Sequence, residues 1–440
     1  MGTILGLNEI AFWIVVTSSL VNVACGVLGC FLVLRRMSML GDAISHAVLP
    51  GLAVAFVVSS LMAGEHGGAF HVPWLMFIGA LAAGLLTALL TELIHRFTNV
   101  HEDAALGVVF TSFFALGVIM ITRLARQVDL DPGCVLYGVL EAAALDTLPV
   151  FGMEIPRVTI TMAVVLLVVL ICVVLFWKEL KIVAFDPHLA TTLGFRAELV
   201  HYLLMALVAS VTVAAFEAVG SILVVAMLIV PAAAAYLLTD RLSWMVVLSA
   251  LIGIASAVLG RWGAARVETS VAGAVAVAAG LFFLLAVLFA PQHGYLAKLF
   301  RRLALALRIV REDTLLLLYR QYEKHPGEPL ATTELASRLG GWLLPRCALI
   351  SLKWSGAVKS ANGGLVLAED SQSKAKELLR GHRLWESYLA DQLGVPADHV
   401  HEPAHRVEHF ISPDMQEELV AQAGQPDKDP HDQPIPRETG

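Results

Sequence analysis

Long apolar stretches recur along the first two thirds of the chain and give way near position 300 to mixed apolar and charged residues. A helix needs about 20 apolar residues to cross a membrane. By this criterion nine stretches are predicted to be membrane spans: 8–34, 39–63, 73–95, 104–122, 157–177, 199–217, 219–238, 243–260 and 270–290. A tenth stretch, 134–150, holds Glu141, Asp146 and Pro149, and we expect a short or re-entrant helix there.

Composition supports a protein embedded in a membrane. Of the 440 residues 58% are hydrophobic and 15% are charged, whereas soluble domains are usually about half apolar and about a quarter charged. The five cysteines form no CxxC pair, which argues against a disulfide framework or a zinc ribbon. The N-terminal stretch lacks a basic flank and an A-x-A cleavage site, so it is predicted to remain as the first span.

The distribution of basic residues predicts the orientation of the chain, because lysine and arginine gather in cytoplasmic loops. With the N-terminus outside, most basic clusters fall on the cytoplasmic side: Arg35–Arg36, His95–Arg96, Lys178 to Arg196, Arg241 and Lys298 to Arg302. Four arginines fall on the other side and weaken the assignment: Arg123, Arg126, Arg261 and Arg266. Nine spans then place the C-terminal part, the tail, in the cytoplasm.

The tail has the pattern of a winged helix followed by further helices. "REDTLLLLYRQYEKHPGEPLATTELASRLGG" predicts helix, turn, helix; "LLPRCALISLKWSGAV" predicts a third helix; "VKSANGGLVLAED" predicts a hairpin around its Asn-Gly. Helices are expected at about 372–393 and 403–423, before an irregular Pro-rich end. The expected fold class is an α-helical polytopic membrane protein of about nine spans with a cytoplasmic winged-helix and helical domain. The expected domains are 1–292 (membrane), 293–310 (linker), 311–371 (winged helix) and 372–440 (helical).

Two stretches in the membrane part carry candidate chemistry. In "MSMLGDAISHAVLPGLAVAF", Asp42 and His46 share a helix face, and a carboxylate with an imidazole can bind a divalent first-row metal. An Asp–His hydrogen bond that stabilises the kink at Pro50, or a position of Asp42 at the membrane interface, explains the pair equally well. "FDPHLATTLGFRAE" predicts a short cytoplasmic helix capped by Asp186, begun by Pro187 and ended by Gly194, and it is either a docking element or an ordinary loop helix.

Over about residues 8–292 the chain resembles the permease subunits of ABC importers for manganese, zinc or iron. The motifs "GDAISHAVLPG", "FDPHLATTLG" and "VGSILVVAMLIVPAAAA" occur in that family's order. The resemblance implies a second permease copy or paralogue, a separate ATPase, an extracytoplasmic metal-binding protein and the bacterial cytoplasmic (inner) membrane with its lipid. It makes Asp42 and His46 the intramembrane metal pair, and it makes the helix with Asp186, Pro187, Leu189 and Gly194 the ATPase-docking element.

The tail carries a second set of candidate ligands. In "HEPAHRVEHF", a helix begun by Pro403 would place His405, Glu408 and His409 on one face. "GHRLWESYL" adds His382 and Glu386 at the same spacing, and His401 could join them. Solvated surface histidines are the alternative, but four histidines and two glutamates at helical spacing favour metal binding.

Over about 372–436, and more loosely over 311–371, the tail is similar to the metal-dependent repressors typified by the diphtheria toxin repressor and the manganese transport regulator. The resemblance implies one metal site at His382, Glu386 and His401. It implies another at His405, Glu408, His409 and Asp313. Iron-type members have Cys at the position of His405, whereas manganese-type members have Asp at the position of Asp313. The chain is therefore intermediate between the two types, and the identity of the metal stays open.

The expected DNA-recognition helix departs from that family, because DNA readers need polar and basic side chains. Apolar residues dominate here: Trp342, Leu343, Leu344, Pro345, Leu349 and Ile350. Residues 301–440 hold 17 Lys+Arg and 20 Asp+Glu, and DNA is therefore not an expected partner. The chain has no GxxxxGK[ST] motif, so we expect a non-enzymatic permease served by a separate ATPase.

The favoured function is a permease subunit that imports a divalent metal and whose tail senses it. Two alternatives remain: a membrane-tethered metal-dependent transcription regulator, and a permease whose tail only dimerises. Nine spans interrupted by polar residues are excessive for an anchor, which argues against the first alternative.

Overall fold

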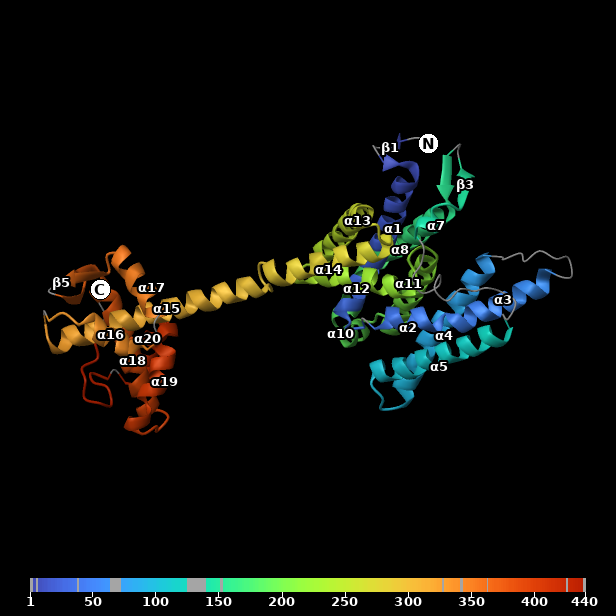
Figure 1. Cartoon of the computed structure of the whole chain (residues 1–440). Coiled ribbons are helices and arrows are strands. Elements are labelled where there is room, and N and C mark those ends of the chain that lie inside the picture. Colours follow the sequence, from blue (N-terminus) through green and yellow to red (C-terminus); the bar gives the residue numbers. More distant parts are fainter. Residues whose placement is uncertain are drawn as a thin grey trace. The chain divides into compact units, whose positions relative to one another are not determined.

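The computed structural model describes residues 3–4, 7–37, 39–63, 73–124, 140–150, 153–326, 328–340, 343–361, 363–424 and 426–437. It divides into two compact units, Met1–Ala297 and Lys298–Gly440, called here the membrane unit and the tail unit. Figure 1 colours the chain from the N-terminus to the C-terminus and labels most of the helices.

The membrane unit consists almost entirely of helices. They are α1 (Glu9–Leu34), α2 (Leu40–Ala47), α3 (Leu49–Ala63), α4 (Pro73–Phe97), α5 (Glu102–Leu124), α7 (Leu140–Ala143), α8 (Arg157–Leu175), α9 (Trp177–Phe185), α10 (Pro187–Thr192), α11 (Ala197–Val219), α12 (Ser221–Leu238), α13 (Leu242–Val267) and α14 (Val271–Phe289). Two short strands, β1 (Thr3–Ile4) and β2 (Leu7–Asn8), precede them.

The predicted spans are confirmed as apolar helices. Eight helical stretches of the described chain are long and apolar enough to cross a membrane, and a ninth, Leu223–Leu238 in α12, is shorter. In α1, 72% of the apolar stretch is buried, against 22% in α5. Helix α1 therefore lies at the centre of the unit, where it contacts α8, α11, α12 and α13, and α5 lies at its edge.

Close approach of helix backbones holds the membrane unit together, as expected where lipid removes the hydrophobic drive between helices. A Cβ added to Gly29 of α1 would lie 1.8 Å from the carbonyl oxygen of Leu228 in α12. One added to Gly51 of α3 would lie 2.1 Å from the carbonyl oxygen of Gly79 in α4. Any larger residue at these positions would force the helices apart.

The second span is interrupted where Pro50 predicted a break. Helix α2 ends at Ala47, Val48 separates it from α3, and α3 begins at Leu49. Proline has no N–H, so Pro50 cannot donate the helical hydrogen bond to the carbonyl of His46. The break at Val48 therefore falls two residues after His46, the second candidate metal ligand of this span.

The short helix predicted for 134–150 is mostly wrong. Residues 134–139 lie outside the described residues, and only α7 is helical in the remainder. β3 (Thr147–Val150) instead pairs antiparallel with β4 (Met153–Pro156), with Thr147 opposite Pro156. Proline destabilises a helix interior but is tolerated on edge strands, and both strands of this hairpin are edge strands.

The first part of the tail unit has the predicted three helices and hairpin. These are α15 (Tyr295–Lys324), which begins just before the unit, α16 (Thr332–Leu339), α17 (Leu343–Trp354), β5 (Val358–Ala361) and β6 (Gly364–Leu367). Leu330 forms a bridge with Leu365 beside the hairpin. The core packs around Leu335, Leu352 and Leu365, each at most 1% exposed. The segment expected to be a linker, 293–310, holds the first half of α15.

The second part of the tail unit follows as α18 (Glu369–Asp391), η1 (Ala397–His399), α19 (His401–Val407), η2 (Glu408–Phe410) and α20 (Pro413–Gln422). The single helix predicted for 403–423 is wrong, because the chain turns at Ile411 and restarts. The Ser412 hydroxyl accepts a hydrogen bond from the Met415 backbone N–H, and Pro413 occupies the first turn of α20. In its described residues the Pro-rich end has no helix or named strand, and its Pro434 carbonyl accepts a hydrogen bond from Arg383 of α18.

Candidate metal centres

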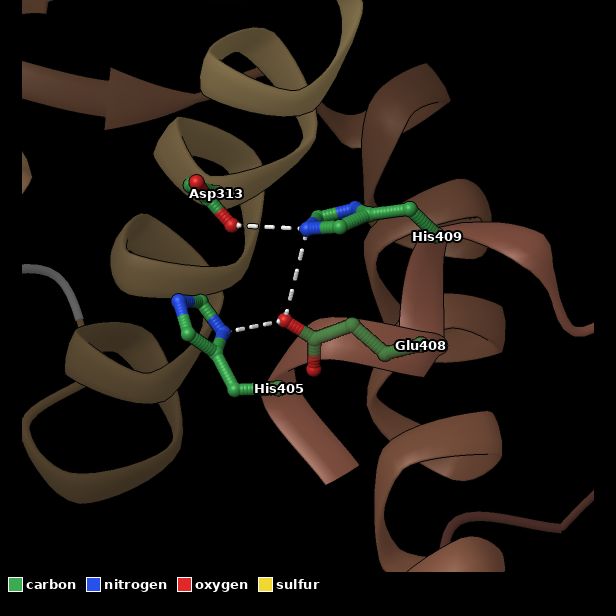
Figure 2. A group of neighbouring side chains, drawn as sticks. All are labelled: Asp313, His405, Glu408 and His409. Atoms are coloured by element: carbon green, nitrogen blue, oxygen red, sulfur yellow. Dashed lines mark hydrogen bonds and ion pairs between the residues drawn. The ribbon is translucent and has the colours of Figure 1, made fainter. Parts of the chain in front are cut away.

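Four of the predicted ligands meet in the first cluster of the tail unit. Asp313 comes from α15, His405 from α19, and Glu408 and His409 from the short turn η2. One potential ligand atom of each lies within 4.8 Å of those of the other three. Figure 2 shows the four side chains pointing toward one another from the two facing segments.

The distances in the first cluster are short. His409 Nε2 lies 3.1 Å from Asp313 Oδ1 and 3.7 Å from Glu408 Oε1, and His405 Nδ1 lies 2.6 Å from the same oxygen of Glu408 (Figure 2). Because η2 follows α19 without a gap, the i and i+3 spacing of His405 and Glu408 survives the change of helix type. The prediction that these residues share a face is therefore met, although not on one continuous α-helix.

Two supporting residues were missed by the sequence analysis. Glu312, 4% exposed, places Oε2 3.0 Å from Nδ1 of His409, and Arg308 donates from Nε to the other oxygen of Glu312 at 3.0 Å. These contacts orient the His409 ring so that Nε2 faces Asp313. A hydrogen bond to the second ring nitrogen commonly orients a metal-binding histidine. The adjacent acidic residues Glu312 and Asp313 were the feature of the sequence that could have predicted this support.

The second cluster consists of His382 and Glu386 of α18 with His401 at the start of α19. Glu386 Oε1 lies 3.0 Å from His382 Nε2 and 2.8 Å from His401 Nδ1. His382 and Glu386 are 2% exposed, whereas His401 is exposed. Two side chains of this cluster are therefore buried, and the third faces solvent.

The two clusters touch through Glu408. Its Oε1 faces His405, while its Oε2 lies 2.5 Å from Nδ1 of His382. Helical spacing could not predict this contact, because the two residues come from segments far apart in the chain.

Burial and ion pairing set the protonation of the clusters. Burial alone would raise the pKa of Glu408, but contacts with His382 and His405 lower it to about 2. Burial likewise opposes the charged form of His409, but Asp313 and Glu312 raise its pKa to about 9. The hydrogen bond to Glu408 raises the pKa of His405. Without metal, the neighbouring carboxylates therefore favour the cationic forms of His382, His405 and His409.

These residues fit a divalent cation. Four buried atoms of the clusters approach a partner closely without hydrogen-bond geometry: Asp313 Oδ1, His382 Nδ1, Glu408 Oε2 and His409 Nε2. Buried polar groups are nearly always hydrogen-bonded, so such atoms call for an explanation. Imidazole and carboxylate together suit manganese, iron or zinc, and a cation in the first cluster would engage Asp313 Oδ1 and His409 Nε2.

The predicted membrane pair is also close in space. His46 Nε2 lies 3.4 Å from Asp42 Oδ1 on α2, and both side chains are partly exposed within this single chain. The rings of Phe110 and Phe114 on α5 lie 6.2 and 5.6 Å from the His46 ring. Among the described residues, no further His, Cys, Asp or Glu completes a group of three around this pair.

The predicted cytoplasmic helix is present as α10. The Asp186 carboxylate accepts hydrogen bonds from the backbone N–H groups of His188 and Leu189 at 2.9 and 3.0 Å, and Pro187 opens the helix. Gly194 ends it with a φ of 85°, a value that favours glycine. Leu189 is 50% exposed, so the helix presents an apolar side chain on its outer face.

The membrane unit is a bundle of apolar helices with one short capped helix, and comparisons with known proteins give its family. Residues 8–290 match the ABC 3 transport family, and the chain belongs to this family. Residues 369–437 match the iron dependent repressor, metal binding and dimerisation domain. The protein is thus a multi-pass permease of a bacterial membrane with a repressor-like tail, and it is not itself an enzyme.

The chain matches most of the length of two individual relatives. The manganese transport system membrane protein MntD of Bacillus subtilis is 46% identical over 292 residues, which are 66% of this chain and 96% of the relative. The zinc transport system membrane protein TroD of Treponema pallidum is 40% identical over 299 residues, 68% of this chain and 79% of the relative.

The structure of PsaBC from Streptococcus pneumoniae in complex with Fab is similar to this fold, with a TM-score of 0.54 and 34% identity over 66% of this chain and 95% of that chain. Membership of an ABC permease family implies an ATPase and a substrate-binding protein as partners. Relatives of both parts tie the chain to divalent metals.

Proposed function

We propose that the protein imports manganese or zinc and that its tail senses the imported ion from the cytoplasm. One observation carries the sensing part. Seven ligand-type side chains lie in two clusters on the same polypeptide as a permease. Manganese and zinc are the ions named in the relatives described above. Iron, also expected from the sequence, is supported only by the name of the tail family.

The pair Asp42 and His46 is proposed to lie on the transport path. Ionisable groups at membrane depth usually face a protein interior or a polar cavity. Both side chains remain partly exposed in the single chain, which fits a path completed by a second permease. A second copy of this chain, or a paralogue, would supply the facing wall and further ligands for the ion.

The helix α10 is proposed to bind the ATPase. Its N-cap, proline and terminal glycine make a short rigid element between α9 and α11. Its outer face presents Leu189, while Phe185 just before it and Leu193 just after it are also exposed. An apolar side chain that fills a pocket of a partner is a common anchor of an interface.

The tail is proposed to slow import when cytoplasmic metal is high. An ion at the first cluster would join Asp313 of α15 to His405, Glu408 and His409, which are far from it in sequence. It would thereby restrain the winged helix against the helical part. A ligand shifts such an equilibrium only by its difference in affinity for the two states, and a shift from 1:99 to 99:1 needs roughly 5.5 kcal/mol.

DNA is not a proposed partner of the tail. Helix α17, at the place of a recognition helix, exposes Leu343, Ile350 and Trp354 at 66%, 60% and 92%, and Trp342 lies outside the described residues. Phosphate neutralisation by Lys and Arg supplies most non-specific DNA affinity, and residues 301–440 are net acidic. A tethered transcription regulator would need a basic face instead.

Elemental analysis of the protein purified with its ATPase tests the proposal. The wild-type chain should retain manganese or zinc, and replacing His405 and His409 with Ala should lower the metal content while uptake into vesicles persists. Unchanged metal content would leave the tail as a dimerising module only. If the complex transported neither manganese nor zinc, the import proposal itself would be contradicted.

A further inference from the structure

The first half of α15 carries an unusual charge distribution. Residues 291–311 contain five basic residues and no aspartate or glutamate. The five are Lys298, Arg301, Arg302, Arg308 and Arg311. Residues 298, 301, 302 and 308 are exposed. A run of this kind is often only a solvated face, so the remaining residues of the helix decide what it does.

The opposite face of the same segment is apolar and exposed. At 100° per residue, the apolar residues 295, 296, 299, 300, 303, 307 and 310 fall within one 140° sector. The basic residues fall outside this sector, where Leu305, Ile309 and the two alanines 297 and 304 are the apolar exceptions. Tyr295 is 63% exposed, Phe300 71% and Leu303 48%. The segment therefore presents an apolar face backed by a cationic one.

The apolar face ends where the tail core begins. Glu312, Thr314, Leu315 and Leu316 are buried, and Arg308 already pairs with Glu312 at 3.0 Å. Lys298, Arg301 and Arg302 are the basic residues of α15 that lie nearest to the last span in the chain.

The membrane is the surface within reach. The last span, α14, ends at Phe289, and α15 begins at Tyr295. The residues between them, 290–294, can extend over no more than about 20 Å. A helix with a large apolar face and a basic polar face lies in the membrane interface, and anionic lipids of the cytoplasmic leaflet attract Lys and Arg near a membrane.

We propose that residues 295–311 form an interfacial helix that lies on the cytoplasmic leaflet and binds anionic phospholipid head groups through Lys298, Arg301 and Arg302. The apolar face carrying Tyr295, Phe300 and Leu303 enters the boundary between head groups and acyl chains. The inference rests on the cytoplasmic tail of the proposed function but not on metal binding by the tail.

Two leucines on opposite faces give a matched test. Leu303 lies in the apolar sector and Leu305 on the basic side, and their exposures are 48% and 43%. Spin labels are placed at Leu303→Cys or Leu305→Cys in a full-length, cysteine-free chain that retains uptake. The chain is reconstituted with its ATPase in vesicles of phosphatidylcholine with or without phosphatidylglycerol. Accessibility to oxygen in the lipid and to a water-soluble nickel complex is then measured.

In vesicles with phosphatidylglycerol, the label at 303 should be accessible to oxygen and shielded from nickel, and the label at 305 should show the reverse. The variant Lys298→Gln, Arg301→Gln, Arg302→Gln should expose the label at 303 to nickel, since each basic residue lost weakens binding about fivefold. The control Lys353→Gln, Lys359→Gln, Lys374→Gln removes three exposed lysines elsewhere in the tail and should change nothing.

Three outcomes would overturn the inference. One is equal access of both labels to nickel. Another is insensitivity to phosphatidylglycerol and to the loss of the three charges. The third is a spin–spin interaction between labels at 303, which would show that the apolar face packs against a second copy. Metal uptake measured in the same vesicles reports separately on the proposed function, which can stand while this inference fails.

Discussion

Glu408 Oε2 lies 2.5 Å from Nδ1 of His382, and this contact joins two groups of ligands that would otherwise be separate. The carboxylate is buried, and its other oxygen faces His405. Replacing Glu408 should therefore disturb both clusters, whereas replacing Glu386 should disturb only the second.

For Glu408→Gln we expect metal affinity to fall at both clusters, and for Glu386→Gln at one. Removal of an outer partner alone commonly costs roughly 10–100-fold in metal affinity, so loss of a direct ligand should cost at least that. Isothermal titration of the tail unit, Lys298–Gly440, with manganese would measure this. Equal effects of the two changes would show that the contact does not couple the clusters. Far-ultraviolet circular dichroism checks that each variant remains folded.

Feedback predicts that transport slows as metal rises on the cytoplasmic face. The double variant His405→Ala, His409→Ala should not slow, because it removes two of the four side chains of the first cluster. Uptake by reconstituted transporter with buffered internal metal provides the measurement. The matched control is His399→Ala, His431→Ala, which removes two exposed histidines outside the clusters. A response shared by all three proteins would leave the tail without a sensing role.

Metal binding by the tail should strengthen as pH rises toward 9. His409, with a pKa of about 9, must lose its proton to bind an ion, so binding releases protons. Calorimetry in buffers of different ionisation enthalpy would count them. Binding that releases no protons near neutral pH would contradict the protonation described for this residue.

The thermal stability of the metal-free tail should be highest at a lower pH than the pH that favours metal binding. The raised pKa of His409 contributes stability that is complete below about pH 6.5 and is lost as pH approaches about 9. The lowered pKa of Glu408 contributes stability that is present above about pH 4.5 and is lost toward about 2. Thermal unfolding of the chelated tail unit should therefore give the highest midpoint between about pH 4.5 and 6.5.

In the membrane unit, Asp42→Ala and His46→Ala should each abolish uptake. Both variants should still insert and bind the ATPase, because neither side chain belongs to the buried helix contacts. Ser45→Ala is a suitable control, since Ser45 lies on the same helix but donates to the Gly41 carbonyl at 2.7 Å. Normal uptake by the Asp42 and His46 variants would exclude this pair from the path.

The proposed docking role of α10 predicts that Leu189→Asp prevents copurification of the ATPase. His188→Asp changes an exposed neighbour on the same helix and should retain the partner, because the apolar anchor remains. Pull-down from detergent-solubilised membranes distinguishes the two. Loss of the ATPase in both variants would point to a general charge effect, not to an apolar contact.

Features with a short-range sequence pattern were predictable. All nine apolar stretches are helical, although the stretch 39–63 is divided into α2 and α3, and ligands spaced three or four apart within a segment met in space. Features that depend on distant parts of the chain were not. The contact of Glu408 with His382 and the support of His409 by Glu312 need tertiary packing. The break at Ile411 could have been predicted from the local sequence, because Ser412 and Pro413 are typical of the start of a new helix.

The tail belongs to the same polypeptide as the permease, to which α15, from Tyr295 to Lys324, connects it, and this fixes the ratio of tails to pores. A separate repressor is made in its own amount, searches for its operator, and acts only after existing transporters have been diluted by growth. In a fused chain each permease has one metal-binding tail, whatever the level of expression. Under the proposed feedback such a tail responds to ions within the lifetime of a single transporter, so control needs no new synthesis.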